Sequence, residues 1–527
     1  MAFTFQINDD VQFIHDETLL KKADEHKPTI IKKEITPVDI VEIVEDSTKL
    51  NGYNVKSSEK SIEHIKEYGL KRDDRMILDF GDHCVGKLRL DIDQVGSPMD
   101  APLYLKLKFA EMPAELAYRS EDYDGWLSKS WIQEETFHID ELPVTLELPR
   151  RYSFRYLEIE VLDTSPKWQA VFSNVVVTTE SSANRANLKK PEISDPILQN
   201  IYDVSLKTLE DCMQDVFEDG PKRDRRLWLG DLRLQALANY VTFDNVALVK
   251  RCLYLFAGMT TTEGKISANV FVRPRTVPDD TFLFEYSLFF ISTLYDFYQA
   301  HADLDFVKEL YPTAKKQMDL TLQMVTKDGK LLTDEDYPVF VDWSNEFHKD
   351  TAGQAELIYV LKQFLSLAKL VQEEDVTQYE TSLNLLTTYA KEQLYDKEKH
   401  LFVTGDSEYN IASQVWMVLA HVMSDEENKK IMTTTKETLF PVKDIATPYM
   451  YHHIVEALFE AGLKEDAVLL MKDYWGKMIF LGADTFWEAF DPDKPNYSPY
   501  GAPIVNSYCH AWSCTPVYLI HKYLLDK

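Results

Sequence analysis

Cysteine is scarce in this chain, with five residues among 527 and no CxxC pair. A small, odd number of dispersed cysteines argues against a disulfide framework and a structural zinc site, and it is typical of thiols kept reduced in a cytosol. We therefore expect no bound metal and a cytoplasmic protein. The residues are Cys84, Cys212, Cys252, Cys509 and Cys514.

Long apolar runs are missing as well. The most hydrophobic stretch, around Phe282 to Tyr298, is interrupted by Glu285 and Asp296, whereas a membrane-spanning helix needs roughly 20 consecutive apolar residues. The first 17 residues carry four carboxylates, where a secretory signal would have a basic start and an apolar core. The sequence therefore predicts neither a membrane anchor nor secretion.

Positive charge is in deficit. The chain has 57 Lys and Arg residues and 87 Asp and Glu residues, which gives a formal net charge of -30. Nucleic acids and anionic membrane surfaces bind clustered basic residues, so neither is expected as a partner. The GxGxxG, phosphate-loop, GxSxG and HExxH motifs are absent. The composition remains compatible with a small neutral or cationic ligand.

The chain is long and apolar enough for at least two domains, and its hydrophobic period changes near residue 185. Before that point, short alternating runs are separated by Gly, Pro and Asp, which is typical of a jelly-roll-like antiparallel β-sandwich. We assign residues 71–185 to this sandwich and residues 1–70 to an N-terminal arm of uncertain structure. The expected strands are Met76–Gly81, Lys87–Ile92, Leu103–Phe109, Thr136–Ile139, Val144–Leu148, Tyr156–Leu162 and Ala170–Thr178.

Residues 186–527 show apolar spacings of three and four, which indicate about twelve helical segments. The segments have no repeat of fixed length, and this disfavours an open solenoid. We therefore predict a closed (α/α)6 toroid of six helical hairpins, within an α+β multidomain fold, with its loops around one pocket. The segments begin near Ile197, Asp231, Asn245, Asp280, Asp303, Thr351, Val376, Tyr409, Asp425, Thr447, Lys464 and Val505.

The most distinctive segment is Asp219–Asp231, which holds three carboxylates, four cationic residues and Trp228 within thirteen residues. Gly220 and Pro221 break the preceding helix, so these charges cannot all lie on a solvated helical face. Carboxylates alternating with arginines beside an indole suit a polyhydroxylated ligand, because they offer acceptors for hydroxyls and a flat surface for a sugar ring. The alternative is a surface cluster of ion pairs.

Three other loops each combine a carboxylate with an aromatic residue, and a further segment places His510 at the start of the last predicted helix. Such carboxylates suit glycoside cleavage, in which one acid protonates the leaving oxygen and a second carboxylate activates water or attacks. A lone helical histidine is more often structural. The segments are Val277–Glu285, Tyr337–Glu346, Asp484–Phe490 and Asn506–Trp512.

The Asp219–Asp231 segment, with Val341-Asp342-Trp343 and Thr485-Phe486-Trp487-Glu488, resembles the inverting α-L-rhamnosidases of glycoside hydrolase family 78. The resemblance covers the helical region and, more weakly, the sandwich at Leu78–Gly81 and Arg151–Val161. It implies a toroid with the pocket at its loop end, no cofactor, and a small glycoside or oligosaccharide as substrate. Cleavage would proceed with inversion.

The resemblance also implies a role for each matching residue. Asp224 aligns with the general acid, and Glu488 aligns with the general base that takes a proton from the attacking water. The predicted substrate-binding residues are Asp219 and Asp231 as acceptors for sugar hydroxyls, Trp228 and Trp343 as aromatic walls, Arg223 and Arg225 as charge-assisted donors to the acids, and Asp342, Trp487 and His510 as further members.

Two departures from the family pattern leave alternatives open. The family usually has glutamate where this chain has Asp224, and the sequence ends at Lys527 without the C-terminal β-domain that many members carry. We then expect the sandwich and its long excursion Ala110–Trp131 to border the pocket. The same machinery acting on another sugar, such as a hexuronic acid, and an inactive carbohydrate-binding protein are the alternatives. Glu285 and Asp280 are rivals for a catalytic role, and a homodimer is compatible with the sequence.

Overall fold

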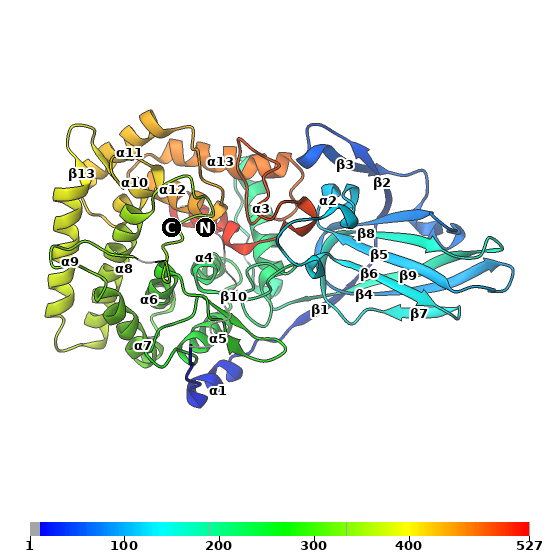
Figure 1. Ribbon diagram of the computed structural model, residues 1–527, viewed down its shortest axis with the longest axis horizontal. Helices are drawn as coiled ribbons and strands as arrows, with labels where there is room; N and C mark the ends of the chain where they lie inside the picture. Colours follow the sequence, from blue (N-terminus) through cyan, green and yellow to red (C-terminus); the bar gives the residue numbers. More distant parts are fainter. Residues whose placement is uncertain (1–10, 189, 334, 526–527) are drawn as a thin grey trace.

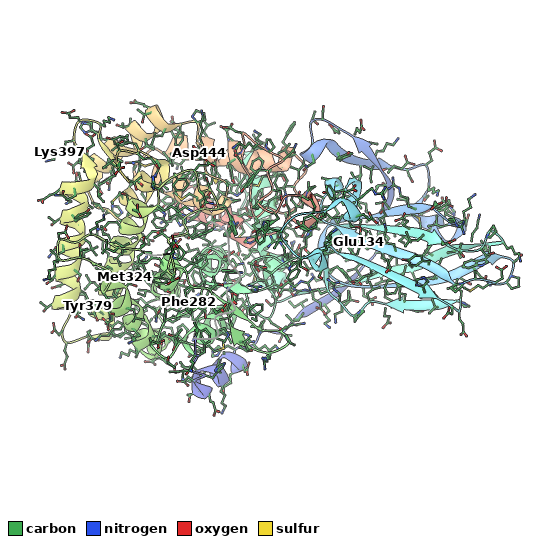
Figure 2. All side chains as sticks on the ribbon, viewed as in Figure 1. Glu134, Phe282, Met324, Tyr379, Lys397 and Asp444 are labelled. Carbon is green, nitrogen blue, oxygen red and sulfur yellow. The ribbon has the colours of Figure 1, made fainter. Side chains whose placement is uncertain are left out.

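The computed structural model describes residues 11–188, 190–333 and 335–525 and contains a strand domain and a helical domain, which lie side by side (Figure 1). The predicted order of an antiparallel sandwich followed by a helical toroid is confirmed. Side chains fill the interior of both domains (Figure 2). Within the described ranges, no helix has the length and apolar character that crossing a membrane requires.

Every pairing between strands of the strand domain is antiparallel in the described part of the chain. The strands follow the order β1-β9-β4-β8-β5-β6, with β2, β3 and β7 attached beside this path. They are β1 (Ile31–Ile35), β2 (Asp39–Glu45), β3 (Tyr53–Ser57), β4 (Arg75–Gly96), β5 (Leu103–Ala110), β6 (Glu134–Ile139), β7 (Val144–Glu147), β8 (Tyr152–Asp163) and β9 (Trp168–Ser181).

Strand β4 organises this domain because it changes neighbours along its 22 residues. Its first part pairs with β2 and β8, and its second part pairs with β7 and β9. The register shifts after Asp79 and again after Arg89, and such irregularities bend and twist a strand. The sequence pattern predicted two strands here, because the exposed Gly81 and Asp82 interrupt the alternation.

The described residues before position 70, assigned to an arm of uncertain structure, contact both domains. Helix α1 (Glu17–Glu25) starts at Asp16, whose carboxylate accepts hydrogen bonds from two amides of the first turn. It packs against α5 (Val246–Ala257) of the helical domain. Strands β1 and β2 pair with β9 and β4, so this segment completes the strand domain.

The helical domain contains twelve α-helices in its described residues, as the count of periodic segments predicted. The even-numbered helices α4 to α14 form an inner ring in which each packs on the next and α14 returns to α4, while α3 closes the outer layer against α13. Short strands lie in the loops, namely β10 (Leu227–Trp228), β11 (Asn269–Phe271), β12 (Val277–Pro278), β13 (Tyr395–Asp396) and β14 (Leu401–Phe402). The helices are α3 (Pro196–Cys212), α4 (Leu229–Tyr240), α5, α6 (Phe284–His301), α7 (Leu304–Leu322), α8 (Asp350–Val371), α9 (Thr377–Tyr389), α10 (Ile411–Leu419), α11 (Asp425–Leu439), α12 (Pro448–Glu460), α13 (Lys464–Phe480) and α14 (Pro516–Tyr523).

The last helix begins at Pro516, later than the periodicity predicted. A helix needs its amides for its own carbonyls, and the amides of the preceding segment have distant partners instead. The pairs are Tyr508 N to Glu111 Oε2 (2.8 Å), His510 N to Phe486 O (2.9 Å) and Ala511 N to Asp219 O (3.0 Å). His510 therefore lies in a buried loop rather than in the last helix.

The excursion Ala110–Trp131 leaves the strand domain and reaches the loop end of the toroid. It contains α2 (Pro113–Ala117), and its Tyr123 is buried in a small cluster with Tyr500 and neighbouring residues of the helical domain. Gly125 packs so closely that a Cβ atom there would lie 2.5 Å from Tyr500 O. The excursion is therefore fixed against the helical domain.

Candidate active site

A cavity of about 160 Å³ opens at the end of the toroid where the inner helices α4, α6, α8 and α14 begin. An apolar cavity of about 150 Å³ can hold benzene, so this volume suits a single sugar ring. The partial positive charge of helix N-termini favours carboxylates at this end. The predicted residues that line it are Asp219, Arg223, Asp224, Trp228, Asp231, Trp343, Glu488 and His510, together with the rival Asp280.

A larger groove of about 580 Å³ lies between the two domains. Its Arg155 guanidinium already binds the carboxylates of Asp484 and Asp79 at 2.8 Å. The smaller cavity is the better candidate because it combines several carboxyl groups with aromatic walls.

Asp219 and Asp224 are presented by a closed loop. The amide of Asp219 donates to Arg226 O, and the amide of Arg226 donates to Asp219 Oδ1, both at 3.0 Å. Asp224 and Arg225 occupy the left-handed region, with φ angles of 64° and 55°. Aspartate tolerates this region better than most residues, so the turn suits Asp224 where the resemblance leads to glutamate.

Glu488 is fixed from both sides in the cavity wall. The guanidinium of Arg223 donates to Glu488 Oε2, and the hydroxyl of Tyr500 donates to Oε1. The Nη1 atom of Arg223 lies 3.9 Å from Asp224 Oδ1, so this guanidinium contacts both carboxylates. Burial raises the pKa of Glu488, against the lowering effect of Arg223 and Tyr500. A carboxylate that is held in place and has a raised proton affinity suits a general base.

Asp219, Asp231 and His510 form a second group in the cavity wall. Burial and the neighbouring carboxylates raise the pKa of both aspartates well above the ordinary range. Burial, with Arg223 nearby, lowers the pKa of His510 well below its ordinary value. The imidazole is therefore neutral, and its distances of 3.8 Å to Asp219 Oδ2 and 3.6 Å to Asp231 Oδ1 are too long for hydrogen bonds.

Asp231 Oδ1 and His510 Nδ1 are both buried without a hydrogen-bond partner in the structure. Buried polar atoms are normally satisfied by protein, water or ligand. These two atoms lie 3.6 Å apart in the cavity wall, so both suit hydrogen bonds with the hydroxyls of a bound ring.

Aromatic rings complete the walls. Trp228 meets Tyr286 edge-on with 6.2 Å between ring centroids, and Trp343 meets Phe340 edge-on at 5.6 Å. Phe340 in turn stacks near Trp512, at 6.1 Å. Their faces offer apolar surface to the C–H groups of a sugar while the carboxylates take the hydroxyls.

Three residues expected at the substrate lie outside the cavity lining, each for a local reason. Arg225 donates to Arg151 O at 2.9 Å, and burial together with Arg151 lowers its pKa to about 10. The Asp342 carboxylate accepts amide hydrogen bonds from its own loop and from the start of α12. Trp487 is buried against Phe490 and a tyrosine.

Of the two rival acids, Asp280 lines the cavity and Glu285 does not. The Glu285 carboxylate accepts hydrogen bonds from the amides of Phe340 (2.8 Å) and Val341 (2.7 Å), so it shapes the loop that carries Trp343. Sequence reasoning did not single out ten lining residues. They are Trp126, Leu127, Arg226, Asp279, Thr281, Leu283, Tyr286, Phe340, Tyr500 and Trp512.

The sequence carried a signal for some of these residues. Arg226 and Trp512 lie inside motifs that were recognised, and Trp126 lies in the aromatic excursion that was expected to border the pocket. Tyr500 carried none, because it lies in a polar loop and its position depends on tertiary contacts, among them those with Glu488 and Tyr123.

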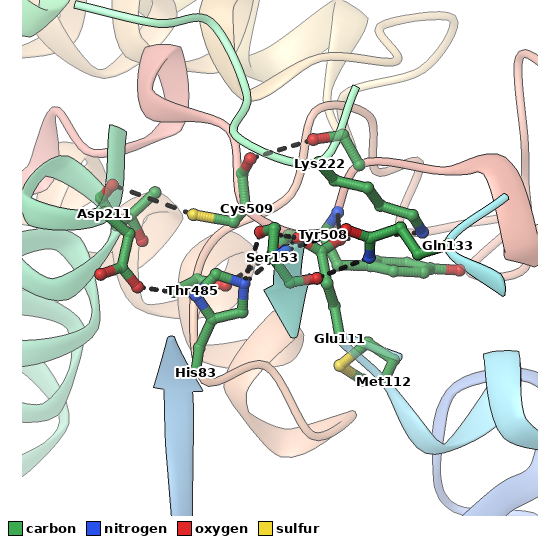
Figure 3. Close-up of polar contacts among 12 residues, drawn as sticks. His83, Glu111, Met112, Gln133, Ser153, Asp211, Lys222, Thr485, Tyr508 and Cys509 are labelled. Carbon is green, nitrogen blue, oxygen red and sulfur yellow. Dashed lines mark hydrogen bonds and ion pairs between the residues drawn. The ribbon is translucent and has the colours of Figure 1, made fainter. Parts of the chain in front are cut away.

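A buried ionic network joins the two domains (Figure 3). His83 of β4 bonds through Nδ1 to Asp211 of α3 at 2.6 Å and through Nε2 to Glu111 at 3.2 Å. Ser153 of β8 donates to Glu111 at 2.7 Å. Burial opposes the charged imidazolium, but Cys509, Asp211 and Glu111 together raise the pKa of His83 well above its ordinary value. The network therefore holds a charged histidine between two carboxylates.

The same network positions the loops that carry the site. Lys222, next to Arg223, is buried and donates to Glu115 of α2 and to Asn506 O at 2.7 Å. Burial raises the pKa of Glu115 to about 7. Residues of the strand domain thus anchor the Asp219–Asp231 loop.

One group in the described residues, His83, Asp211 and Cys509, has potential metal-ligand atoms within 4.8 Å of one another. The Asp211 carboxylate already bonds to His83 and, at 2.8 Å, to Lys207. These contacts describe a hydrogen-bonded ionic group, so we assign no metal to it.

Two family models match the chain. The N-terminal domain of glycosyl hydrolase family 78 α-rhamnosidases matches residues 37–179, and the six-hairpin glycosidase domain of bacterial α-L-rhamnosidases matches residues 190–524. No match was found among curated protein sequences.

Solved structures resemble the chain along most of its length. A rhamnosidase from Klebsiella oxytoca, solved with rhamnose bound, is 42% identical with a TM-score of 0.94, over 98% of this chain and 100% of that chain. A family 78 rhamnosidase of Bacillus sp. GL1 is 21% identical with a TM-score of 0.71, over 85% of this chain and 46% of that chain. An α-L-rhamnosidase of Streptomyces avermitilis complexed with L-rhamnose is 18% identical with a TM-score of 0.64, over 94% and 44%. The latter two show the fold alone.

Proposed function

Because the chain belongs to glycoside hydrolase family 78, we propose that it removes terminal α-L-rhamnose from small glycosides or oligosaccharides, with inversion at the anomeric carbon. The rhamnose bound to the 42% identical relative supports this sugar. The volume of about 160 Å³, which suits one ring, supports cleavage at a chain end.

In this proposal, Asp224 gives its proton to the glycosidic oxygen as the C–O bond breaks. Glu488 takes a proton from a water molecule that attacks the opposite face of the sugar, so the product has the inverted configuration. The observation that carries the proposal is Arg223, which binds the Glu488 carboxylate and also lies 3.9 Å from that of Asp224. Two carboxylates spaced around one guanidinium suit an acid and a base acting on one ring.

In this scheme, hydrogen bonds to the sugar hydroxyls come from Asp219, Asp231 and His510. A carboxyl group with a raised pKa can donate a hydrogen bond as well as accept one, and the neutral imidazole of His510 has the same versatility. Trp228 and Trp343 supply apolar walls for the ring and its methyl group.

The charge of the cavity argues against a hexuronic acid as the sugar. Its lining carries six carboxyl groups, and two guanidinium groups oppose them. A carboxylate on the substrate would compete for guanidinium groups that already have partners, because Arg223 binds Glu488 and Arg226 lies 3.7 Å from Asp279. An unpaired charge in a partly desolvated site disfavours binding. The inactive-protein alternative would have to explain why Asp224 and Glu488 are both retained at the cavity.

Inversion can be tested directly. The sugar first released from an α-L-rhamnoside should be the β-anomer, because water attacks the face opposite the leaving group. Proton NMR during the first minutes of the reaction, before mutarotation, would identify it. A retained α-anomer would mean that a carboxylate attacks the sugar, and the role of Glu488 as a base would then be wrong.

The pH profile offers a second test, on the base. The Tyr500 hydroxyl donates to the Glu488 carboxylate and lowers its pKa. In Tyr500→Phe that pKa should rise further, so the acidic limb of kcat/KM, where the base becomes protonated, should move to higher pH. Kinetics from pH 4 to 8 on the wild type and the variant would measure the displacement.

A matched control for this test is Tyr118→Phe. Tyr118 lies in the excursion, and its hydroxyl donates to Asp122 O at 3.2 Å, away from Glu488. It should leave the limb in place. If the acidic limb of Tyr500→Phe does not move, or moves to lower pH, a group other than Glu488 causes that limb.

A further inference from the structure

The cavity takes one ring, so the group that leaves with the glycosidic oxygen must lie at its mouth. Among the lining residues, Trp126 is the most exposed, with 51% of its surface accessible to solvent. It comes from the excursion of the strand domain, and Leu127 lies beside it in the lining. The mouth of the site is therefore built in part by a domain that supplies neither proposed catalytic residue.

We propose that the exposed face of Trp126 binds a ring of the leaving group, and that the strand domain thereby sets the enzyme's preference among leaving groups. The inference rests on the proposed glycosidase function and adds a second binding site to it. The ligand is defined by its chemistry, which is a six-membered ring with an apolar face, either aromatic or a second sugar.

The orientation of Trp126 fits this role. Its indole Nε1 donates to Pro499 O at 3.2 Å, which fixes the polar edge of the ring. One side packs against Tyr500, with 5.7 Å between centroids at 49°. The residue is nevertheless 51% exposed and lines the cavity, so part of its surface is presented at the mouth.

The support beneath Trp126 is rigid. Tyr123 is 1% exposed and reaches Tyr500 O with its hydroxyl at 3.5 Å. Gly125 fills the remaining space, since any larger residue would collide with Tyr123 and Tyr500. A surface held in its binding geometry loses little conformational entropy when a ligand stacks on it.

Tyr500 links this surface to the reaction centre. Its hydroxyl bonds to Glu488, and its ring packs against both Trp126 and Trp343. A ring stacked on Trp126 is thus one side chain away from the proposed base, within reach of a group bonded to the anomeric oxygen.

The test compares Trp126→Ala with the wild-type enzyme on three α-L-rhamnosides. Methyl rhamnoside has no ring in the leaving group, 4-nitrophenyl rhamnoside has an aromatic ring, and rhamnosyl-(1→6)-glucose has a sugar ring. Stacking of this kind is worth a factor of about 3 to 10 in kcat/KM. We expect that loss on the two ring-bearing substrates relative to the methyl glycoside, whose value corrects for any change in the cavity wall. A loss on only one of the two would identify which ring the site takes.

Controls separate this result from general damage. Phe480→Ala removes an aromatic side chain that is 61% exposed on α13, outside the cavity, and should change nothing. Trp126→Tyr keeps a flat ring and should recover most of the activity. Inhibition by free rhamnose, which occupies the inner cavity alone, should be equal in all variants.

Two outcomes would overturn the inference. They are an equal loss on all three substrates, and no loss on either ring-bearing substrate. Failure of the proposed function looks different, because the wild-type enzyme would then cleave none of the three rhamnosides.

Discussion

The Asp224→Asn variant should lose about 10²- to 10⁴-fold in kcat/KM on methyl α-L-rhamnoside, the usual contribution of general acid catalysis, and far less on an aryl rhamnoside. A nitrophenolate departs with little need for a proton, whereas methoxide does not. Comparing the two substrates in the same variant cancels any change in folding or sugar binding. The ratio of the two losses is the quantity to measure.

Asp280→Asn is the matched control, since Asp280 also lines the cavity. It should affect both substrates equally. Should Asp280→Asn show the leaving-group dependence instead, the acid is Asp280 and the alignment of Asp224 with the family's acid fails at this position.

The Glu488→Gln variant should lose activity on both substrates, again by about 10²- to 10⁴-fold. Water must give up a proton whichever group leaves, so a better leaving group cannot compensate. Glutamine keeps one oxygen that can accept from Arg223, and its amide NH2 can donate to the hydroxyl oxygen of Tyr500. Thermal unfolding should confirm that the variant folds. A loss confined to methyl rhamnoside would mean that Glu488 is the acid and Asp224 the base.

Azide provides an independent check on Glu488. In Glu488→Ala, the space left by the side chain admits an anion, and azide attacks without needing a base. Activity should return in part, and β-L-rhamnosyl azide should accumulate. Recovery that yields free rhamnose alone would show that azide does not act as the nucleophile.

The fold followed from periodicity because each domain repeats one simple pattern. Alternation in residues such as Leu88, Leu90 and Ile92 places every second side chain in the sandwich core. The errors occur where tertiary contacts override local preference. Gly81 and Asp82 interrupt the pattern of β4 without ending the strand. Tyr508, His510 and Ala511 donate their amides to other segments instead of a helix.

The site was only partly accessible from sequence. Motifs rich in charge and aromatic residues placed Asp219 to Asp231, Glu488 and His510 near one another, because loops of a closed toroid meet at one end. The same logic cannot distinguish a carboxylate that faces the cavity from one that ties a loop, as Asp342 and Glu285 do. Which way a loop side chain points depends on hydrogen bonds to segments more than 50 residues away.

Tyr500 and Trp126 show a second limit. Neither belongs to a charged motif, and their positions arise from a contact between segments of the two domains, in which the bonded residues lie more than 370 positions apart in sequence. A pattern within one segment carries no information about such a contact. The aromatic character of the excursion could indicate that it borders a pocket, but not which of its rings does so.

Through the ionic network, the strand domain supplies partners for buried charges of the helical domain. Asp211 and Lys222 belong to the helical domain, yet their partners His83 and Glu115 come from the strand domain. Leaving one partner of a buried ion pair alone costs about 3–5 kcal/mol. A toroid separated from its sandwich, or joined to a foreign one, would keep buried charges without these partners next to the Asp219–Asp231 loop. The predicted boundary near residue 185 therefore separates two folds that share one buried ionic network, so a change at one end of the network alters the charge balance at the other.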